Sequence, residues 1–323
     1  MPRLLLGPLV VAALLAACTS DGEPEPSPEV TSLAGGDASS FSAQVASSDL
    51  AADSPEPVQV GVFSSTDEAG VRLLSFGEVA VEFSFLGDGS QQPMTGPAAT
   101  AAFVPAADTA GGGDVPTLTN PADVAGVYIT AEITFPEAGV WNATVTASVD
   151  DGAPFTLEAA FTVYPEHRLP APGDRALATK NLTIHSEGAP AVAIDSRAQG
   201  GAKVPDPELH DTTIAEALRD DRPALVQFAT PVYCTSKFCG PTVEAQEELA
   251  REYEDVAEFI HVEIWKKKTP TKGIVNEAAA EWLLREGDLT EPWLYLIDAD
   301  GTIVERWGPL FDLDDVRAAL EGL

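Results

Sequence analysis

The sequence has few basic residues, which narrows the range of partners it can bind. It carries 18 lysine and arginine residues against 51 aspartate and glutamate residues, giving a net charge of −33 over 323 residues. Nucleic acids are bound through clustered lysine and arginine, so this charge argues against a nucleic-acid partner and against electrostatic docking onto anionic lipid. The excess of acid is typical of a soluble, self-repelling surface. It is also compatible with a salty habitat that screens the repulsion.

Cysteine is scarce as well. The chain has three cysteines, too few for a disulfide scaffold. Cys18 stands alone near the start, whereas Cys234 and Cys239 are separated by only four residues. If Cys18 is modified and so takes no part in a disulfide, Cys234 and Cys239 can form a disulfide with each other.

Long hydrophobic runs are also missing. The apolar run over residues 4–17 is interrupted by Gly7 and Pro8 and is shorter than the roughly 20 residues of a relaxed bilayer span. Because Arg3 precedes this run and small residues end it, we predict that residues 1–17 are a signal peptide.

The signal peptide is predicted to end in Leu15-Ala16-Ala17-Cys18. This string resembles the lipobox of bacterial lipoproteins, and the resemblance implies that Cys18 carries the lipid. An ordinary cleaved signal with a stray cysteine is the alternative. The lipoprotein reading places the mature protein at the extracytoplasmic face of the cell membrane, held by its lipid anchor. Disulfides are permitted in that compartment.

The next part of the chain predicts a tether followed by an all-β domain. Residues 18–57 are rich in small, polar and acidic residues without apolar periodicity, so we expect a disordered tether. Residues 58–164 contain short runs that alternate apolar and polar side chains and are separated by turn residues, which favours a β-sandwich. The sequence around Trp141 resembles a strand–turn–strand of Ig-like bacterial domains. The predicted strands cover residues 58–63, 79–87, 100–106, 126–135, 139–149 and 155–164.

The C-terminal part predicts an α/β domain over residues 209–323, after a linker over residues 165–208. Strands alternate with helices in this part, as in α/β sheets. A capping box at Thr213 opens the first helix, and Asp312 caps the last one. The predicted helices cover residues 213–220, 240–255, 274–287 and 312–323, and the predicted strands cover residues 223–230, 257–265 and two segments within 292–308.

This element order resembles the thioredoxin fold. Phe238-Cys239-Gly240-Pro241 is similar to the start of the Trp-Cys-Gly-Pro-Cys motif of that family, and Pro292 stands where the family has a cis-proline. The resemblance implies that Phe238, Gly240, Pro241 and Pro292 contact the substrate chain. The chain departs from the family at Thr242, which replaces the second cysteine. It departs again at Gln227, which replaces a buried acid of the central strand, and at Phe238, which replaces the tryptophan.

The two neighbouring cysteines predict a membrane-anchored extracytoplasmic thiol–disulfide oxidoreductase. Because a helix N-terminus favours an anion, we expect Cys239 to be the more acidic thiol, aided by Lys237. Cys239 is then the attacking residue and Cys234 the resolving one, acting on extracytoplasmic protein thiols or a redox partner.

Two alternatives remain open. One is a non-catalytic interaction module with a structural Cys234–Cys239 disulfide. The other is a copper(I)-handling protein, because the cysteine pair resembles that of thioredoxin-like copper-delivery proteins. Against copper, the spacing differs and no histidine follows His261, which is expected to be a packed or edge-exposed strand residue and not a ligand. We therefore predict neither a cofactor nor a metal site.

Overall fold

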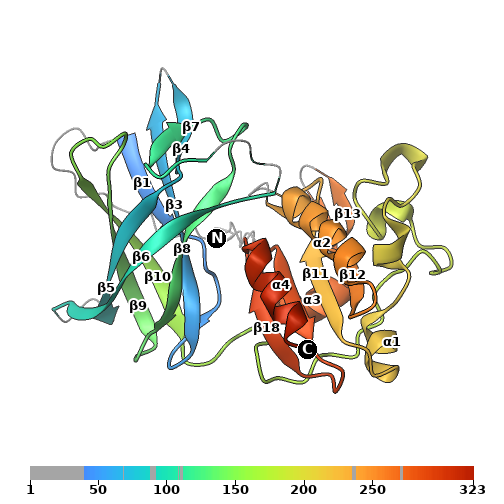
Figure 1. Ribbon diagram of the computed structural model, residues 1–323. Coiled ribbons are helices and arrows are strands. Elements are labelled where there is room, and N and C mark those ends of the chain that lie inside the picture. The colour runs from blue at the N-terminus through green and yellow to red at the C-terminus, as the bar shows by residue number, and fades with distance from the viewer. Residues whose placement is uncertain are drawn as a thin grey trace, which may run out of the picture. The chain divides into compact units, whose positions relative to one another are not determined.

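The computed structural model describes residues 40–67, 69–87, 92–107, 109, 112–234, 238–269 and 272–323. The predicted signal peptide, Cys18 and the first part of the predicted tether lie outside these residues. Within the described ranges, no helix combines the length and the apolar character needed to cross a membrane. The described chain consists of a large curled β-sheet followed by a smaller mixed α/β region (Figure 1).

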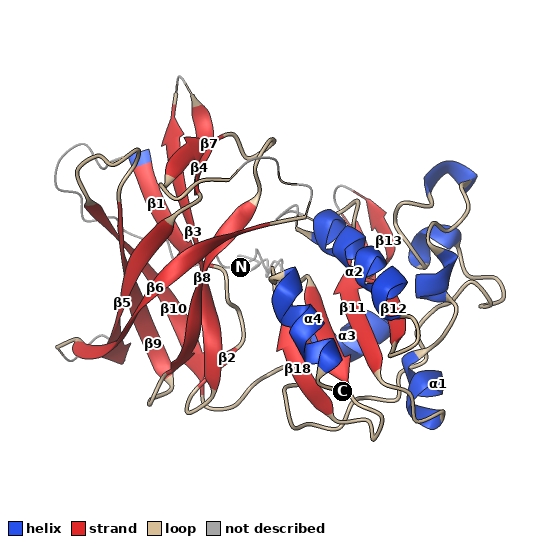
Figure 2. Ribbon diagram, viewed as in Figure 1, coloured by secondary structure: helices blue, strands red, loops and turns tan. Residues whose placement is uncertain are grey.

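The curled sheet contains ten strands (Figure 2). Nine of them follow the order β2-β10-β9-β5-β6-β8-β3-β4-β7, and β1 pairs with β3. All pairs are antiparallel except β10 with β2. The strands are β1 (Phe41–Val45), β2 (Leu50–Ala51), β3 (Pro55–Thr66), β4 (Gly70–Ser75), β5 (Glu78–Gly87), β6 (Met94–Pro105), β7 (Thr117–Thr119), β8 (Gly126–Thr134), β9 (Gly139–Ala147) and β10 (Phe155–Tyr164).

Along each main strand of this sheet, every second side chain tends to point into the core. In β9, Trp141, Ala143 and Val145 are buried while the residues between them are partly exposed, as expected for one face turned inward. The Phe83 and Trp141 rings each lie against Phe135, with centroids 5.2 and 4.9 Å apart. Trp141 also explains why residue 96 is glycine, because a Cβ atom at this position would lie 2.5 Å from the indole ring.

The sheet differs from the predicted Ig-like sandwich. All six predicted strands are present, but they belong to one hydrogen-bonded sheet and not to two packed sheets. β1 lies in the range predicted as a tether, where Phe41 packs on Phe155 with ring centroids 4.5 Å apart. Alternation along a strand indicates one buried face in both architectures, so it could not distinguish a curled sheet from a sandwich.

Residues 165–208 have little regular structure but are firmly packed. They contain three short 3₁₀ turns, η2 (Ala191–Ala193), η3 (Gln199–Gly201) and, at the boundary with the next region, η4 (Pro207–His210). Leu169 belongs to the core of the α/β region. Asp195 and Ser196 are fully buried. This segment therefore connects the curled sheet to the α/β region and also packs against the α/β region as part of it.

The α/β region is built on a four-stranded sheet of order β12-β11-β17-β18. β11 and β12 are parallel, β17 is antiparallel to β11, and β18 is antiparallel to β17. The elements are α1 (Ile214–Arg219), β11 (Ala224–Ala229), α2 (Cys239–Tyr253), β12 (Glu258–Glu263), β13 (Trp265–Thr269), β14 (Lys272–Val275), α3 (Glu277–Leu283), β15 (Leu284–Arg285), β16 (Asp288–Leu289), β17 (Trp293–Ile297), β18 (Ile303–Trp307) and α4 (Leu313–Glu321).

Helices cover both faces of this sheet. Val226 and Phe228 of β11 face α1 and α3, whereas Leu225, which precedes them, faces α2 and α4. All six residues of β11 are buried, as the apolar run predicts for a central strand. The predicted capping box is confirmed, because the Thr213 hydroxyl accepts a hydrogen bond from the Glu216 backbone N–H at 3.1 Å.

Local boundaries differ from the prediction in two places. α3 ends at Leu283, and the predicted helix end at Gly287 instead lies in the turn between β15 and β16, where Glu286 and Gly287 both have positive φ angles. The lysine run at 266–268 belongs to β13, which pairs with β14, although no strand was predicted after residue 265 until residue 292. Short hairpins of this kind depend on turn geometry that apolar periodicity does not report.

Candidate thiol site

Cys234 and Cys239 lie at the point where β11 leads into α2. Cys239 is the first residue of α2. Cys234 follows a turn after β11 in which its backbone N–H donates to the Thr230 carbonyl at 3.2 Å. Lys237 and its two preceding neighbours lie outside the described residues, so the predicted effect of Lys237 on Cys239 stays a prediction.

A carboxyl group completes the site. The sulfur atoms of Cys234 and Cys239 and one carboxylate oxygen of Glu291 all lie within 4.8 Å of one another. Glu291 precedes β17, and its peptide bond to Pro292 is cis. Because β17 pairs with β11, the start of β17 lies beside the end of β11, which brings Glu291 to the thiols.

The two thiols differ in exposure. Cys239 is completely buried and packs with Ala229 and Val243, whereas Cys234 is half-buried. Burial, followed by a hydrogen bond to Cys234 and the charges of Cys234 and Glu291, raises the pKa of the Cys239 thiol far above its usual value. Burial therefore shifts the pKa of Cys239 in the direction opposite to the one expected from a helix N-terminus.

Glu291 is the neutral acid of the site. Its Oε2 is buried without a hydrogen-bond partner among the described residues. Burial, with smaller effects from the charges of Cys234 and Glu263, raises the pKa of Glu291 to about 8, although Lys268 lowers it. A carboxyl group with this pKa is protonated near neutral pH, so Glu291 can donate a proton to a sulfur atom or accept one from it.

A second buried acid, Glu263, is close enough to Glu291 for its charge to raise the pKa of Glu291. Glu263 ends β12, where its Oε2 accepts a hydrogen bond from the Ser196 N–H at 2.8 Å and its Oε1 accepts one from the Trp265 N–H at 3.1 Å. Burial raises the pKa of Glu263. In β11 itself, Gln227 is fully buried and offers no carboxyl group. The acids instead come from the end of β12 and from the segment that precedes β17.

The other residues of the predicted motif lie around the start of α2. Gly240 and Pro241 are in the first turn. The Thr242 hydroxyl donates to the Cys239 carbonyl at 3.2 Å, so the helix backbone binds this hydroxyl. Phe238 is half-buried and packs against a small apolar cluster with Ala106 and Leu310.

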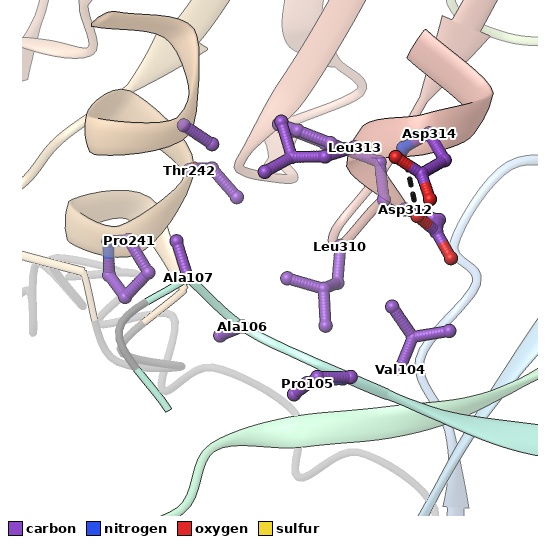
Figure 3. A pocket seen from close by; sticks show the side chains of 12 residues that line it. Val104, Pro105, Ala106, Ala107, Pro241, Thr242, Leu310, Asp312, Leu313 and Asp314 are labelled. Atoms are coloured by element: carbon purple, nitrogen blue, oxygen red, sulfur yellow. Dashed lines mark hydrogen bonds between the residues drawn. The ribbon is translucent and has the colours of Figure 1, made fainter. Parts of the chain in front are cut away.

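A cavity of about 320 Å³ lies beside this helix turn, on the side of Pro241 and Thr242. Figure 3 shows these two residues across from Leu310 and Val104. Among the described residues, neither the cysteines nor Glu291 line the cavity. It is therefore separate from the thiol site.

Two groups of described side chains have ligand atoms close enough to hold a metal ion. Cys234, Cys239 and Glu291 offer two sulfurs and one oxygen, and Asp195, His210 and His261 offer two ring nitrogens and one oxygen. His261 is fully buried in β12, which confirms that it is a packed strand residue.

Comparisons with known proteins do not assign the chain to a family. No family model matches it, and no curated protein matches it either. The function is therefore argued from the site itself.

Proposed function

We propose that the protein is a thiol–disulfide oxidoreductase in which Cys234 and Cys239 alternate between a dithiol and a disulfide. The observation that carries the proposal is the meeting of two thiols and a carboxyl group within 4.8 Å of one another. Disulfide exchange requires those functions: a sulfur that a partner can reach, a second sulfur beside it, and a group that moves the proton.

The backbone around the site supports a thioredoxin-like fold for the α/β region. The order β12-β11-β17-β18 has a parallel pair followed by two antiparallel strands. Cys234 lies between β11 and α2, Cys239 is the first residue of α2, and Pro292 directly precedes β17. This arrangement resembles that of thioredoxin-like proteins, which supports our proposal that an extended substrate chain docks beside Pro292.

Exposure assigns the two cysteines to different steps. Cys234 is half-buried and Cys239 is fully buried, so a partner chain reaches Cys234 first. We accordingly assign Cys234 as the residue that forms the mixed disulfide and Cys239 as the resolving residue. This reverses the order expected from the helix N-terminus alone.

The exchange is balanced as follows. A substrate thiolate attacks the Cys234 sulfur of the disulfide, the Cys234–Cys239 bond breaks, and its electron pair goes to the Cys239 sulfur, which takes the proton of the Glu291 carboxyl group. A second substrate thiolate then attacks the substrate sulfur of the mixed disulfide and releases Cys234. Two electrons have passed from the substrate dithiol to the protein. In the opposite direction, the Glu291 carboxylate accepts the Cys239 proton and a substrate disulfide is reduced.

Glutathione disulfide and single cysteine variants test the assignment. Cys239→Ser should form a lasting mixed disulfide at Cys234, visible by mass spectrometry, because no second thiol resolves it. Cys234→Ser should form little, because Cys239 is buried. Both variants should lose insulin reduction, whereas Cys18→Ser, which removes the third cysteine of the chain, should keep it.

Two results would overturn the proposal. One is unchanged insulin reduction in both site variants. The other is a reduction potential of the Cys234–Cys239 pair below about −300 mV, which marks a structural disulfide and favours the non-catalytic interaction module. A stoichiometric copper(I) complex with both thiols in an anaerobic titration, without exchange activity, favours copper handling instead.

We also propose that the chain works outside the cytoplasm, attached by a lipid on Cys18. The lipobox-like string supports this location, which is an oxidising space suited to thiol exchange. Incorporation of labelled palmitate in a bacterial host tests it. Label should enter the wild type and be absent from Cys18→Ser.

A further inference from the structure

Three ligand-type side chains meet at a second place in the α/β region. Asp195 follows η2, His210 is the last residue of η4, and His261 is in the middle of β12. Each of these residues is completely buried. Two of the chain's four histidines are therefore brought together with a carboxylate, without access to water.

The distances between these groups match the coordination sphere of a small metal ion. Nε2 of His210 lies 3.3 Å and Nδ1 of His261 lies 3.6 Å from Oδ2 of Asp195. Zinc binds nitrogen and oxygen at about 2.0–2.1 Å, so neighbouring ligand atoms in a tetrahedron are about 3.4 Å apart. A cation placed between the three atoms would therefore be reached by all of them with little movement.

The hydrogen bonding of His261 leaves a lone pair directed at the carboxylate. Its Nε2 lies 3.2 Å from the Ala229 carbonyl oxygen, which can only accept, so Nε2 carries the hydrogen. In the neutral ring Nδ1 then has a lone pair and faces Oδ2 of Asp195. Metal-binding histidines are usually oriented by such a bond from the other nitrogen to a carbonyl.

Neither contact with Asp195 is a good hydrogen bond. Nδ1 of His261 and both ring nitrogens of His210 lack a partner of proper geometry within the described part of the chain. Leaving a buried polar atom unsatisfied costs about 1–3 kcal/mol. A cation bound to Nδ1 of His261, one nitrogen of His210 and Oδ2 of Asp195 would remove this cost for two of the three atoms.

The surrounding charge also suits a divalent cation. Arg197 donates to both carboxylate oxygens of Asp195 and pairs with Asp206 and Glu247, each at 2.9 Å. When all four of these groups are ionised, one positive and three negative charges leave a net charge of −2. The arginine thus orients the carboxylate, and Oδ2 of Asp195 would be shared between Arg197, which donates to it at 2.7 Å, and the ion.

We propose that Asp195, His210 and His261 form a binding site for one divalent transition-metal ion of the zinc class. The ion would join residues 191–210 to β12 and to the end of β11. The site is independent of the thiols and of the proposed exchange reaction. Its three protein ligands leave one tetrahedral position open.

Metal titration of the full chain, purified in detergent and stripped with a chelator, tests the proposal. Wild type should bind one zinc ion, and cobalt(II) should give a visible spectrum without thiolate charge-transfer bands. The Cys234→Ser/Cys239→Ser variant should bind equally well. His210→Gln should bind at least about 10-fold more weakly, whereas His185→Gln, which alters an exposed histidine of the neighbouring loop, should bind normally.

Three outcomes would overturn the site: no binding at millimolar zinc, loss of binding in the double cysteine variant with retention in His210→Gln, or a cobalt spectrum dominated by thiolate bands. Circular dichroism should establish that His210→Gln is folded. If it is not, the cobalt spectrum of the wild type decides between imidazole and thiolate ligands.

Discussion

The two regions of the molecule bury different kinds of side chain. The core of the curled sheet is aliphatic and aromatic, and its buried titratable residues among those described are Asp49 and Tyr128. The α/β region buries a thiol, two carboxyl groups and two imidazoles: Cys239, Asp195, Glu263, His210 and His261. The comparison indicates that the curled sheet is held by apolar packing, whereas the α/β region carries the reactive groups.

The regions are joined by a buried ion cluster. Arg306 of β18 donates to Oδ2 of Asp49 at 2.8 Å and to Oε1 of Glu56 at 2.8 Å. It also contacts Nδ1 of His167 at 2.7 Å. Gln59 of β3 adds two hydrogen bonds with the backbone of Leu310. The stability of one region is therefore coupled to that of the other.

The largest expected effect comes from the core tryptophans. Trp141 in the curled sheet and Trp282 in α3 are both buried, and each indole N–H donates a hydrogen bond at 2.9 Å. Trp141→Ala and Trp282→Ala should each lower the free energy of unfolding by about 3–5 kcal/mol, measured by denaturant titration. Only Trp282→Ala should alter thiol exchange while the protein is folded. A loss of exchange in folded Trp141→Ala would contradict the division of roles.

Arg306→Met tests the link between the regions. It removes the arginine that faces Asp49, whose side chain is only 1% exposed. Breaking a buried ion pair on one side costs about 3–5 kcal/mol, and we expect the lower end because backbone N–H groups of Arg168 and Leu169 still bind Asp49.

The double variant Asp49→Asn/Arg306→Met is the control for this effect. It should be more stable than Arg306→Met, since no unpaired charge remains buried. Equal stability of the two variants in urea titrations would mean that the charge of Asp49 is not the cause.

Glu291→Gln tests the proton-transfer role in the α/β region. The pKa of Glu291 is raised to about 8, chiefly by burial, so its carboxyl group becomes a base only as the pH passes that value. Reduction of a model disulfide by the dithiol form should therefore accelerate through about pH 8 in the wild type. Glu291→Gln should lose this acceleration and about 100-fold in rate.

The quantity to compare is the ratio of the wild-type rate to the variant rate at each pH. Titration of the thiols changes the rates of both proteins, so it cancels in this ratio. Glu187→Gln, which changes an exposed acid, should give a ratio of one at every pH. A constant ratio for Glu291→Gln between pH 6 and pH 9 would exclude proton transfer by this residue.

Thr213→Ala should have the smallest effect. The hydroxyl and Glu216 form the reciprocal capping box of α1, and its removal costs about 1 kcal/mol. The packing of the curled sheet should not change, although the sheet unfolds in the same transition as the α/β region. The rate of thiol exchange should also be unchanged. Thermal unfolding measures the loss, and a shift as large as that of Arg306→Met would mean that α1 has a further role.

Sequence patterns predicted the elements more reliably than their assembly. The six β runs, the buried run of β11 and the caps at Thr213 and Asp312 are confirmed. The short strands β1, β4 and β7 were missed: β1 and β4 pair with the nearby β3, whereas β7 pairs with β4, which is distant in sequence. The single curled sheet was missed because the pattern within one strand does not report which strands pair with it.

The candidate site shows the same division. The nearness of Cys234 and Cys239 follows from four intervening residues, and the placement of Cys239 at a helix start follows from the pattern around Pro241. Glu291 and Glu263 had no local signal, since an acid near a strand end is ordinary in a chain with 51 of them. The burial of Cys239 depends on Ala229 and Val243, which pack on it from β11 and α2.

By itself the sequence determined the helices, the main strands and the nearness of the two neighbouring cysteines, because periodicity, caps and short spacing act within one segment. Only the tertiary structure decided that Cys239 is the protected thiol, that Glu291 is the acid beside it, and that Asp195 meets two histidines. Those outcomes depend on which strands become neighbours and on how much water remains, and both are properties of the assembled sheet.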